Sequence, residues 1–109
     1  MGCLMRSDSN LLSDALTEEV ARTFRVLADP TRVRILGLLL HREQCVSEIA
    51  RRLGMSVSAV SHQLGLLRSL RLVRRSRRGK RAFYALDDDH VRTLFHDALE
   101  HAQEKRHDG

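Results

Sequence analysis

One segment at residues 45–70, CVSEIARRLGMSVSAVSHQLGLLRSL, constrains the fold more than any other part of the chain. Its first apolar residues recur at helical spacing up to Leu53, and Gly54 is the residue type that most often ends a helix. Ser56 is a favoured N-cap and begins a second helix that extends through Leu70. Two helices joined by a short turn that contains glycine predict a helix-turn-helix.

The second helix of this pair has an apolar stripe and an opposite polar face. The stripe consists of Val57, Val60, Leu64 and Leu67. Small polar side chains near the start of such a helix can enter a major groove and exchange hydrogen bonds with base edges. The residues predicted to contact DNA here are Ser56, Ser58, Ser61, His62 and Gln63. An ordinary solvent-exposed face is the alternative interpretation.

A basic segment with an extended pattern follows. Across residues 72–86, LVRRSRRGKRAFYAL, apolar pairs flank a turn at Arg78-Gly79, which predicts a β-hairpin. Its tip is expected to hold the basic residues Arg74, Arg75, Arg77, Arg78, Lys80 and Arg81. Such a density of like charge repels itself unless phosphates neutralise it, so Arg77, Arg78 and Lys80 are predicted DNA contacts, with a solvated charge run as the alternative. The fold class is therefore mostly α with a small β-hairpin, a dimeric winged helix-turn-helix.

The N-terminal part is expected to add an arm and two helices. Residues 1–12 are predicted to be a flexible arm, and residues 13–106 the domain that binds DNA and dimerises. Apolar residues at helical spacing predict an amphipathic helix from Ser13 to Ala28. Asp29-Pro30 then supplies the cap and first residue of a helix that is apolar nearly all round, the expected centre of the core. A short connection from His41 to Cys45 is expected to follow.

Length and charge narrow the class of protein. A chain of 109 residues supports one domain with a limited core, which a dimer interface would supplement. Its 19 Lys and Arg against 14 Asp and Glu give a net charge of +5, which favours a polyanion, first of all double-stranded DNA, as the partner. No apolar run approaches the roughly 20 residues that span a bilayer, and the two cysteines form no CxxC pair. We expect a cytoplasmic protein with no membrane partner.

The last segment, DDDHVRTLFHDALEHAQEKRHDG, carries metal-type ligands that one chain cannot bring together. Its acidic start predicts a helix N-terminus. In one helix, His90 and His101 lie about 16 Å apart along the axis and within about 20° of the same face. Glu104 is one turn from His101, and Asp88 stands beside His90. Zinc holds such ligands at about 2 Å, so a single straight helix cannot supply all four.

A second copy of the helix removes this difficulty. If two such helices pack antiparallel about a two-fold axis, the Asp88/His90 end of one meets the His101/Glu104 end of the other. This arrangement predicts two identical four-ligand sites and a homodimer. The alternative is a charged, solvated helix with scattered histidines.

The chain also resembles the ArsR/SmtB family of metal-sensing repressors. The motifs that carry the resemblance are LADPTRVRIL, CVSEIARRLGMSVSAVSHQLGLLRSLRLV, RRGKRAFYAL and a terminal D-x-H with a later H-x-x-E. The resemblance as a whole runs from about Ala15 to Glu104. The resemblance implies a dimeric repressor that binds operator DNA when metal-free and releases it when metal binds. In members that sense zinc through the C-terminal helix, the ligands match Asp88, His90, His101 and Glu104.

The choice of metal is less constrained. Family members that sense soft metals use a Cys-x-Cys pair, whereas this chain has Cys45 followed by Ser47, and one thiolate suits a soft ion poorly. Cys3 is expected to lie in the arm and is not expected to bind. Two imidazoles and two carboxylates favour Zn²⁺; Ni²⁺ or Co²⁺, which take more ligands, are the alternative, with His96 and His107 as candidates.

Two other functions are compatible with parts of this sequence. A zinc hydrolase keeps one coordination position open for water, but these four ligands would close the shell, and the chain has no HExxH motif, so we expect no enzyme. A metal-independent winged-helix repressor stays open as the alternative. Zinc-dependent loss of operator binding separates these interpretations.

Overall fold

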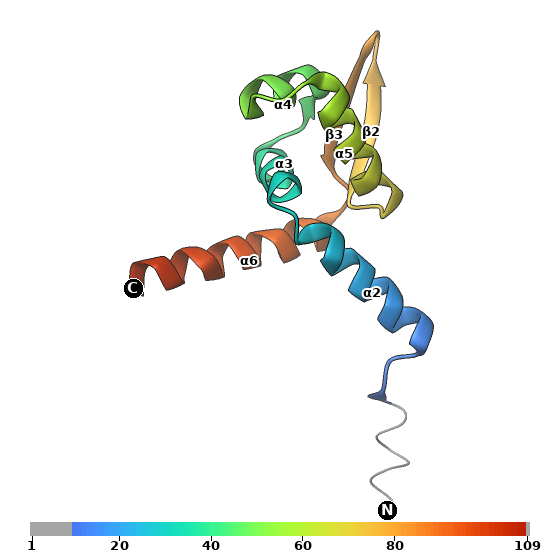
Figure 1. Cartoon of the computed structure of the whole chain (residues 1–109), viewed down its shortest axis with the longest axis vertical. Helices are drawn as coiled ribbons and strands as arrows, with labels where there is room; N and C mark the ends of the chain where they lie inside the picture. Colours follow the sequence, from blue (N-terminus) through green and yellow to red (C-terminus); the bar gives the residue numbers. More distant parts are fainter. Residues whose placement is uncertain (1–9, 109) are drawn as a thin grey trace, which may run out of the picture.

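The computed structural model describes residues 10–108 and is a winged helix-turn-helix (Figure 1). Its elements are α2 (Asp14–Leu27), α3 (Pro30–His41), β1 (Gln44–Cys45), α4 (Val46–Leu53), α5 (Val57–Ser69), β2 (Val73–Arg78), β3 (Arg81–Leu86) and α6 (Asp89–Asp108). The fold class predicted from the sequence is confirmed. Most of the predicted N-terminal arm, residues 1–9, lies outside the described residues.

The helix boundaries follow from local capping. The Ser13 hydroxyl accepts a hydrogen bond from the Leu16 N–H at 3.1 Å, and the Asp29 carboxylate caps α3 with Pro30 in the first helical turn. Ser56 caps α5 through the Ala59 N–H at 3.0 Å. Gly54 ends α4 with φ of 65°, a left-handed conformation that glycine adopts without strain. These predicted starts and stops are all confirmed.

The sheet contains one strand that the sequence did not predict. Its strand order is β1-β3-β2, and both pairings are antiparallel. The segment from His41 to Cys45, expected to be only a connection, includes β1, in which Gln44 pairs with Tyr84. Gln44 is buried and donates a hydrogen bond to the Leu38 carbonyl at 2.8 Å. Two residues are too short to show a period, so this strand leaves no sequence pattern.

The core lies between α3, the helix-turn-helix and the sheet. The expected central role of α3 is confirmed, because Ile35, Leu36 and Leu39 are fully buried. They pack with the apolar stripe of α5, namely Val60, Leu64 and Leu67. Val57 is the exception: the sequence placed it on this stripe, but it is 52% exposed because it stands at the first residue of α5.

The two terminal helices, α2 and α6, extend from this body in different directions (Figure 1). The amphipathic helix α2 is present as predicted, yet none of its residues is buried. Leu16, Val20 and Phe24 are 46%, 40% and 55% exposed. On α6, Leu94 and Leu99 are 41% and 38% exposed. A single chain therefore leaves the apolar faces of both helices uncovered. No helix in the described part of the chain is long and apolar enough to cross a membrane.

Candidate nucleic-acid interface and metal-ligand residues

The start of α5 presents the polar residues that were predicted to meet DNA. Ser56, Ser58, Ser61 and His62 are all exposed. The Ser56 oxygen accepts the capping hydrogen bond and its hydroxyl proton stays available to a further acceptor. Gln63 differs, since it is half-buried and its side-chain oxygen accepts a hydrogen bond from Arg32 Nε of α3 at 2.8 Å. A contact from Gln63 to a base would therefore use the amide nitrogen.

The tip of the hairpin is exposed at Arg77 and Lys80, but Arg78 is engaged within the molecule. Its guanidinium forms an ion pair with Glu43, which precedes β1 in the chain. The same guanidinium lies over the Phe83 ring, 4.8 Å from the ring centroid. A phosphate that binds Arg78 must therefore compete with Glu43 for this side chain.

The base of the hairpin carries basic residues that the sequence placed at its tip. Arg74 and Arg75 are the second and third residues of β2, about 13 Å and 10 Å along the strand from Arg78. The Arg74 guanidinium donates hydrogen bonds to the carbonyls of Leu86 and Asp87 at 2.9 and 2.8 Å. The prediction that all six basic residues lie at the tip is therefore wrong for these two.

The start of α6 orients one predicted pair of metal ligands. Asp88 Oδ1 accepts a hydrogen bond from the Val91 N–H at 3.0 Å, which caps the helix. This hydrogen bond is the main reason why the pKa of Asp88 is lowered from its usual value, so the group stays an anion. Asp88 Oδ2 lies 3.7 Å from His90 Nδ1. The Asp88 carboxylate and the His90 imidazole therefore lie side by side, and the His90 side chain is 98% exposed.

The second pair, His101 and Glu104, lies further along the same continuous helix and is exposed. Among residues 10–106, no group of three or more His, Cys, Asp or Glu side chains is placed to hold a metal ion. One chain thus offers two separated pairs, each with one nitrogen and one oxygen ligand. This donor set is of the type that zinc accepts, and both pairs are open to solvent. Coordination by these four residues stays a prediction.

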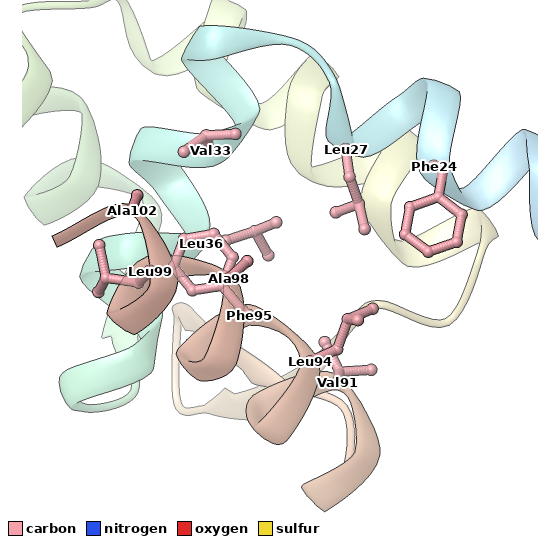
Figure 2. Close-up of a pocket in the computed structure, with 10 residues that line it drawn as sticks. All are labelled: Phe24, Leu27, Val33, Leu36, Val91, Leu94, Phe95, Ala98, Leu99 and Ala102. Atoms are coloured by element: carbon pink, nitrogen blue, oxygen red, sulfur yellow. The ribbon is translucent and has the colours of Figure 1, made fainter. Parts of the chain in front are cut away.

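An apolar groove lies beside α6 (Figure 2). It is lined by Phe24, Leu27, Val33, Leu36, Val91, Leu94, Phe95, Ala98, Leu99 and Ala102 of α2, α3 and α6. Leu94 follows His90 by four residues and precedes His101 by seven, so all three project from one side of the helix. At Leu94 the groove therefore adjoins the side of α6 that carries both ligand pairs.

The remaining candidate ligands stand apart from these pairs. Cys45 is the N-cap residue of α4, and its sulfur lies 3.3 Å from the Ser47 hydroxyl, a hydrogen bond that is the main cause of its lowered pKa. Cys3 and the His107 side chain lie outside the part of the chain that is described. His96 is near Asp97 and Glu100, and six residues from His90 amount to about 240° of rotation. His96 thus projects from a different side of α6 than His90.

Comparison with known proteins identifies the family. The model of the arsR family of bacterial regulatory proteins matches residues 29–75, which extend from the α3 cap into β2. A transcriptional repressor SmtB homolog from Synechocystis is 44% identical over 87 residues, which cover 80% of this chain and 66% of that protein. A cadmium resistance transcriptional regulatory protein CadC homolog from Staphylococcus aureus is 39% identical, over 79% of this chain and 72% of that protein. The chain belongs to the ArsR family.

The solved structures agree with this ArsR-family assignment. The homodimeric winged helix-turn-helix DNA-binding domain of a possible ArsR-family regulator from Mycobacterium bovis has a TM-score of 0.83 and 35% identity. The alignment covers 90% of this chain and 94% of that domain. The family and the fold are those of DNA-binding transcriptional regulators, so the expectation that the protein is not an enzyme is confirmed. Just under two thirds of the Synechocystis relative is matched, and the rest of that protein has no counterpart in the alignment.

Three long-range contacts of this ArsR-family chain could not be predicted from the sequence, and two of them involve residues of the candidate interface. Arg32 donates a hydrogen bond to the side-chain oxygen of Gln63, and Glu43 forms an ion pair with the guanidinium of Arg78. Arg92 Nη1, in the first turn of α6, donates a hydrogen bond to the Leu40 carbonyl at 2.6 Å. Each contact joins residues at least 31 positions apart, so no local pattern indicates it.

Proposed function

We propose that the protein is a homodimeric repressor that binds operator DNA and is released when Zn²⁺ binds between the C-terminal helices of the two chains. The observation that carries this proposal is the arrangement of α6. It has two nitrogen-and-oxygen ligand pairs at separate points of one side, next to an apolar groove that a single chain leaves open. Neither pair alone can close a four-ligand shell, and a second chain supplies what is missing.

The uncovered apolar faces support a dimer that uses α2 and α6. Phe24 of α2 and Leu94 and Leu99 of α6 line the groove, and all three are more than a third exposed. A second copy that packs α6 antiparallel to the first would remove these side chains from water. It would also bring the Asp88/His90 pair of one chain to the His101/Glu104 pair of the other. The homodimeric state of the Mycobacterium bovis domain supports this arrangement.

DNA binding in this proposal uses the start of α5 and the tip of the wing. Ser58, Ser61 and His62 reach base edges, while Arg77 and Lys80 contact phosphates. Ser56, Gln63 and Arg78 also take part, each after its intramolecular hydrogen bond or ion pair is shared or released. Two such heads in a dimer would read two half-sites, so their spacing determines operator affinity.

Release would follow from a change in the placement of α6. Asp88 and His90 of one chain and the His101/Glu104 pair of the second chain would hold the zinc ion, which would link the two chains rigidly. The first turn of α6 is tied to the end of α3 by the hydrogen bond from Arg92 to the Leu40 carbonyl. Three residues later, Glu43 holds Arg78 of the wing. A shift of α6 is thereby transmitted to a DNA-contacting element, and DNA must weaken metal binding by the same factor.

The donor set favours zinc over the other metals considered. Two imidazoles and two carboxylates form a four-coordinate nitrogen and oxygen shell. The name of the Staphylococcus aureus relative refers to cadmium resistance, but Cys45 has no second cysteine beside it among residues 10–106. Nickel or cobalt is the second candidate, because both accept further histidine ligands.

The first prediction concerns the metal response. Operator DNA selected in vitro should bind the metal-free protein tightly, and stoichiometric zinc should weaken binding by about 5- to 150-fold, the usual range of allosteric coupling. Fluorescence anisotropy measures operator affinity in parallel with Zn²⁺, Ni²⁺, Co²⁺ and Cd²⁺. A chelator added afterwards should reverse the effect of each metal. The Glu104→Gln variant is the control and should bind DNA without responding to zinc. Equal affinity with every metal would favour the metal-independent repressor instead.

The second prediction concerns the wing. Replacing Glu43 with glutamine removes the anion that competes for Arg78, so DNA affinity should rise and its salt dependence should steepen by about 0.9 in the log-log slope. Arg77→Ala should instead make the slope shallower by a similar amount, about 0.9. Glu43→Gln in an Arg78→Ala background is the matched control and should change nothing further. A Glu43→Gln protein that binds DNA more weakly would show that Glu43 positions Arg78 for DNA and does not compete for it.

A further inference from the structure

A concentration of arginines lies at the base of the hairpin, at the opposite end of α5 from the predicted base contacts. A shallow pocket there, between the end of α5 and the start of β2, is lined by Arg68, Arg71, Val73, Arg74, Arg75 and Asp87. Four arginines and one aspartate give this arginine pocket a net charge of +3. Composition alone would assign these arginines to a uniformly basic surface, whereas the fold gathers them around one concavity.

The positive charge of the arginine pocket is not neutralised within the chain. Arg68, Arg71 and Arg75 form no ion pair with any of the residues that the structure describes. Arg74 is held by the carbonyls of Leu86 and Asp87, which fix its orientation but carry no net charge. Three guanidinium groups without an ion pair in the described chain therefore surround the fixed guanidinium of Arg74. Such a set is suited to an anion that accepts several hydrogen bonds at once.

The backbone at Arg71 adds a second observation. Its φ of 58° makes it the one non-glycine residue with positive φ in the described chain, in a conformation that glycine or asparagine adopts at lower cost. The Arg71 N–H bonds the Arg68 carbonyl at 2.9 Å as the chain leaves α5. Strain of this kind accumulates at sites where a side chain serves a function. Here the conformation places an arginine in the wall of the pocket.

We propose that the arginine pocket binds a phosphate group. Guanidinium forks match phosphate oxygens in geometry and charge, which favours phosphate over a carboxylate at a pocket with several forks. The site is separate from the predicted phosphate contacts of the wing tip, because Arg74 and Arg75 lie about 10 to 13 Å from Arg78 along β2. Its phosphate comes either from DNA outside the operator core or from a free phosphorylated molecule. The first source rests on the proposed function, whereas the second does not.

The test uses two variants that spare Arg74. Arg71→Gly removes one guanidinium and suits the left-handed backbone, so the melting temperature should stay the same or rise. Arg75→Gln removes a second charge from an exposed strand position. Lys105→Gln/Arg106→Gln, in the last turns of α6, lowers the net charge by as much as Arg71→Gly and Arg75→Gln together at a remote place and is the matched control.

The first arm measures binding of inorganic pyrophosphate to the full-length protein by NMR titration. The unaltered protein and Lys105→Gln/Arg106→Gln should bind alike, and the Arg71→Gly/Arg75→Gln double variant about tenfold more weakly. The second arm compares a short duplex limited to the operator core with one extended by a helical turn at each end. If flanking DNA is the source, the double variant should lower the salt slope by about 0.9 to 1.8 on the long duplex only.

The outcomes distinguish the two sources of phosphate from each other and from failure of the proposal. Weaker pyrophosphate binding with unchanged DNA slopes assigns the site to a free phosphorylated molecule. A lower slope on the long duplex assigns it to flanking DNA. If the double variant matches Lys105→Gln/Arg106→Gln in both pyrophosphate binding and salt slopes, the phosphate site is overturned, even if the protein still represses through α5 and the wing.

Discussion

Replacing both Leu94 and Leu99 with glutamate is expected to convert the protein to monomers and to abolish selective operator binding. Both side chains line the apolar groove, where two buried, unpaired carboxylates would oppose association. A monomer has one reading head, so affinity for a two-half-site operator should approach the non-specific level, a loss of at least about 10³-fold. Analytical ultracentrifugation gives the oligomeric state, and anisotropy with operator and unrelated DNA gives the selectivity.

The fold of the chain should survive this double substitution. Neither leucine belongs to the buried core, which consists of residues from α3, α4, α5 and the sheet. Circular dichroism should therefore show the helix content of the unaltered protein. Gln103→Glu adds a carboxylate to the same helix outside the groove and should leave the dimer intact. A double variant that remains dimeric would exclude the groove as the interface.

The helix starts could be predicted because each depends on residues three positions apart. Ser13, Asp29 and Ser56 each accept a hydrogen bond from the backbone N–H of the third residue that follows. The turn at Gly54 is equally local, since its left-handed backbone follows from the absence of a β-carbon. The division between helix-turn-helix and wing is therefore present in the sequence without any knowledge of tertiary packing.

The contacts that modify the DNA-binding residues could not be predicted in this way. Glu43 reaches Arg78 only because β1 pairs with β3 and thereby brings the connection after α3 next to the wing. The two-residue strand that causes this has no detectable period. The density of basic residues predicts a tip that includes Arg74, although the turn at Arg78-Gly79 leaves this residue at the base of β2. Such pairings depend on the assembled sheet.

The candidate metal site could be predicted from the sequence only in part. Helical geometry alone predicts that His90 and His101 share one side of α6 and cannot meet in one chain, and the continuous helix from Asp89 to Asp108 agrees with that. The sequence also predicts that α2 is amphipathic, but a period cannot tell which apolar face a single chain covers. The exposed groove is what adds a reason for two chains to meet beside these ligands.

The sharing of ligands between chains leads to the second large effect. His90→Ala and His101→Ala homodimers should each lose the zinc response almost completely, because every site then lacks one of its two imidazoles. Operator binding without metal should persist, since neither residue lies in α5 or the wing. The Asp88 cap of α6 should also persist, because it uses the Val91 N–H and not His90. Zinc affinity and operator release measured on both homodimers provide the baseline.

A heterodimer of the two variants is the decisive protein. One of its sites combines the intact Asp88/His90 pair of the His101→Ala chain with the intact His101/Glu104 pair of the His90→Ala chain, while the other site lacks both histidines. If ligands are shared across the dimer, mixing the variants should restore one tight zinc site per dimer, measured by titration against a competing chelator. If each site instead lay within one chain, both sites of the heterodimer would stay damaged. Mixing would then restore no zinc binding, which would exclude a site shared between chains. Recovery of a single site, in contrast, requires that two chains hold one ion.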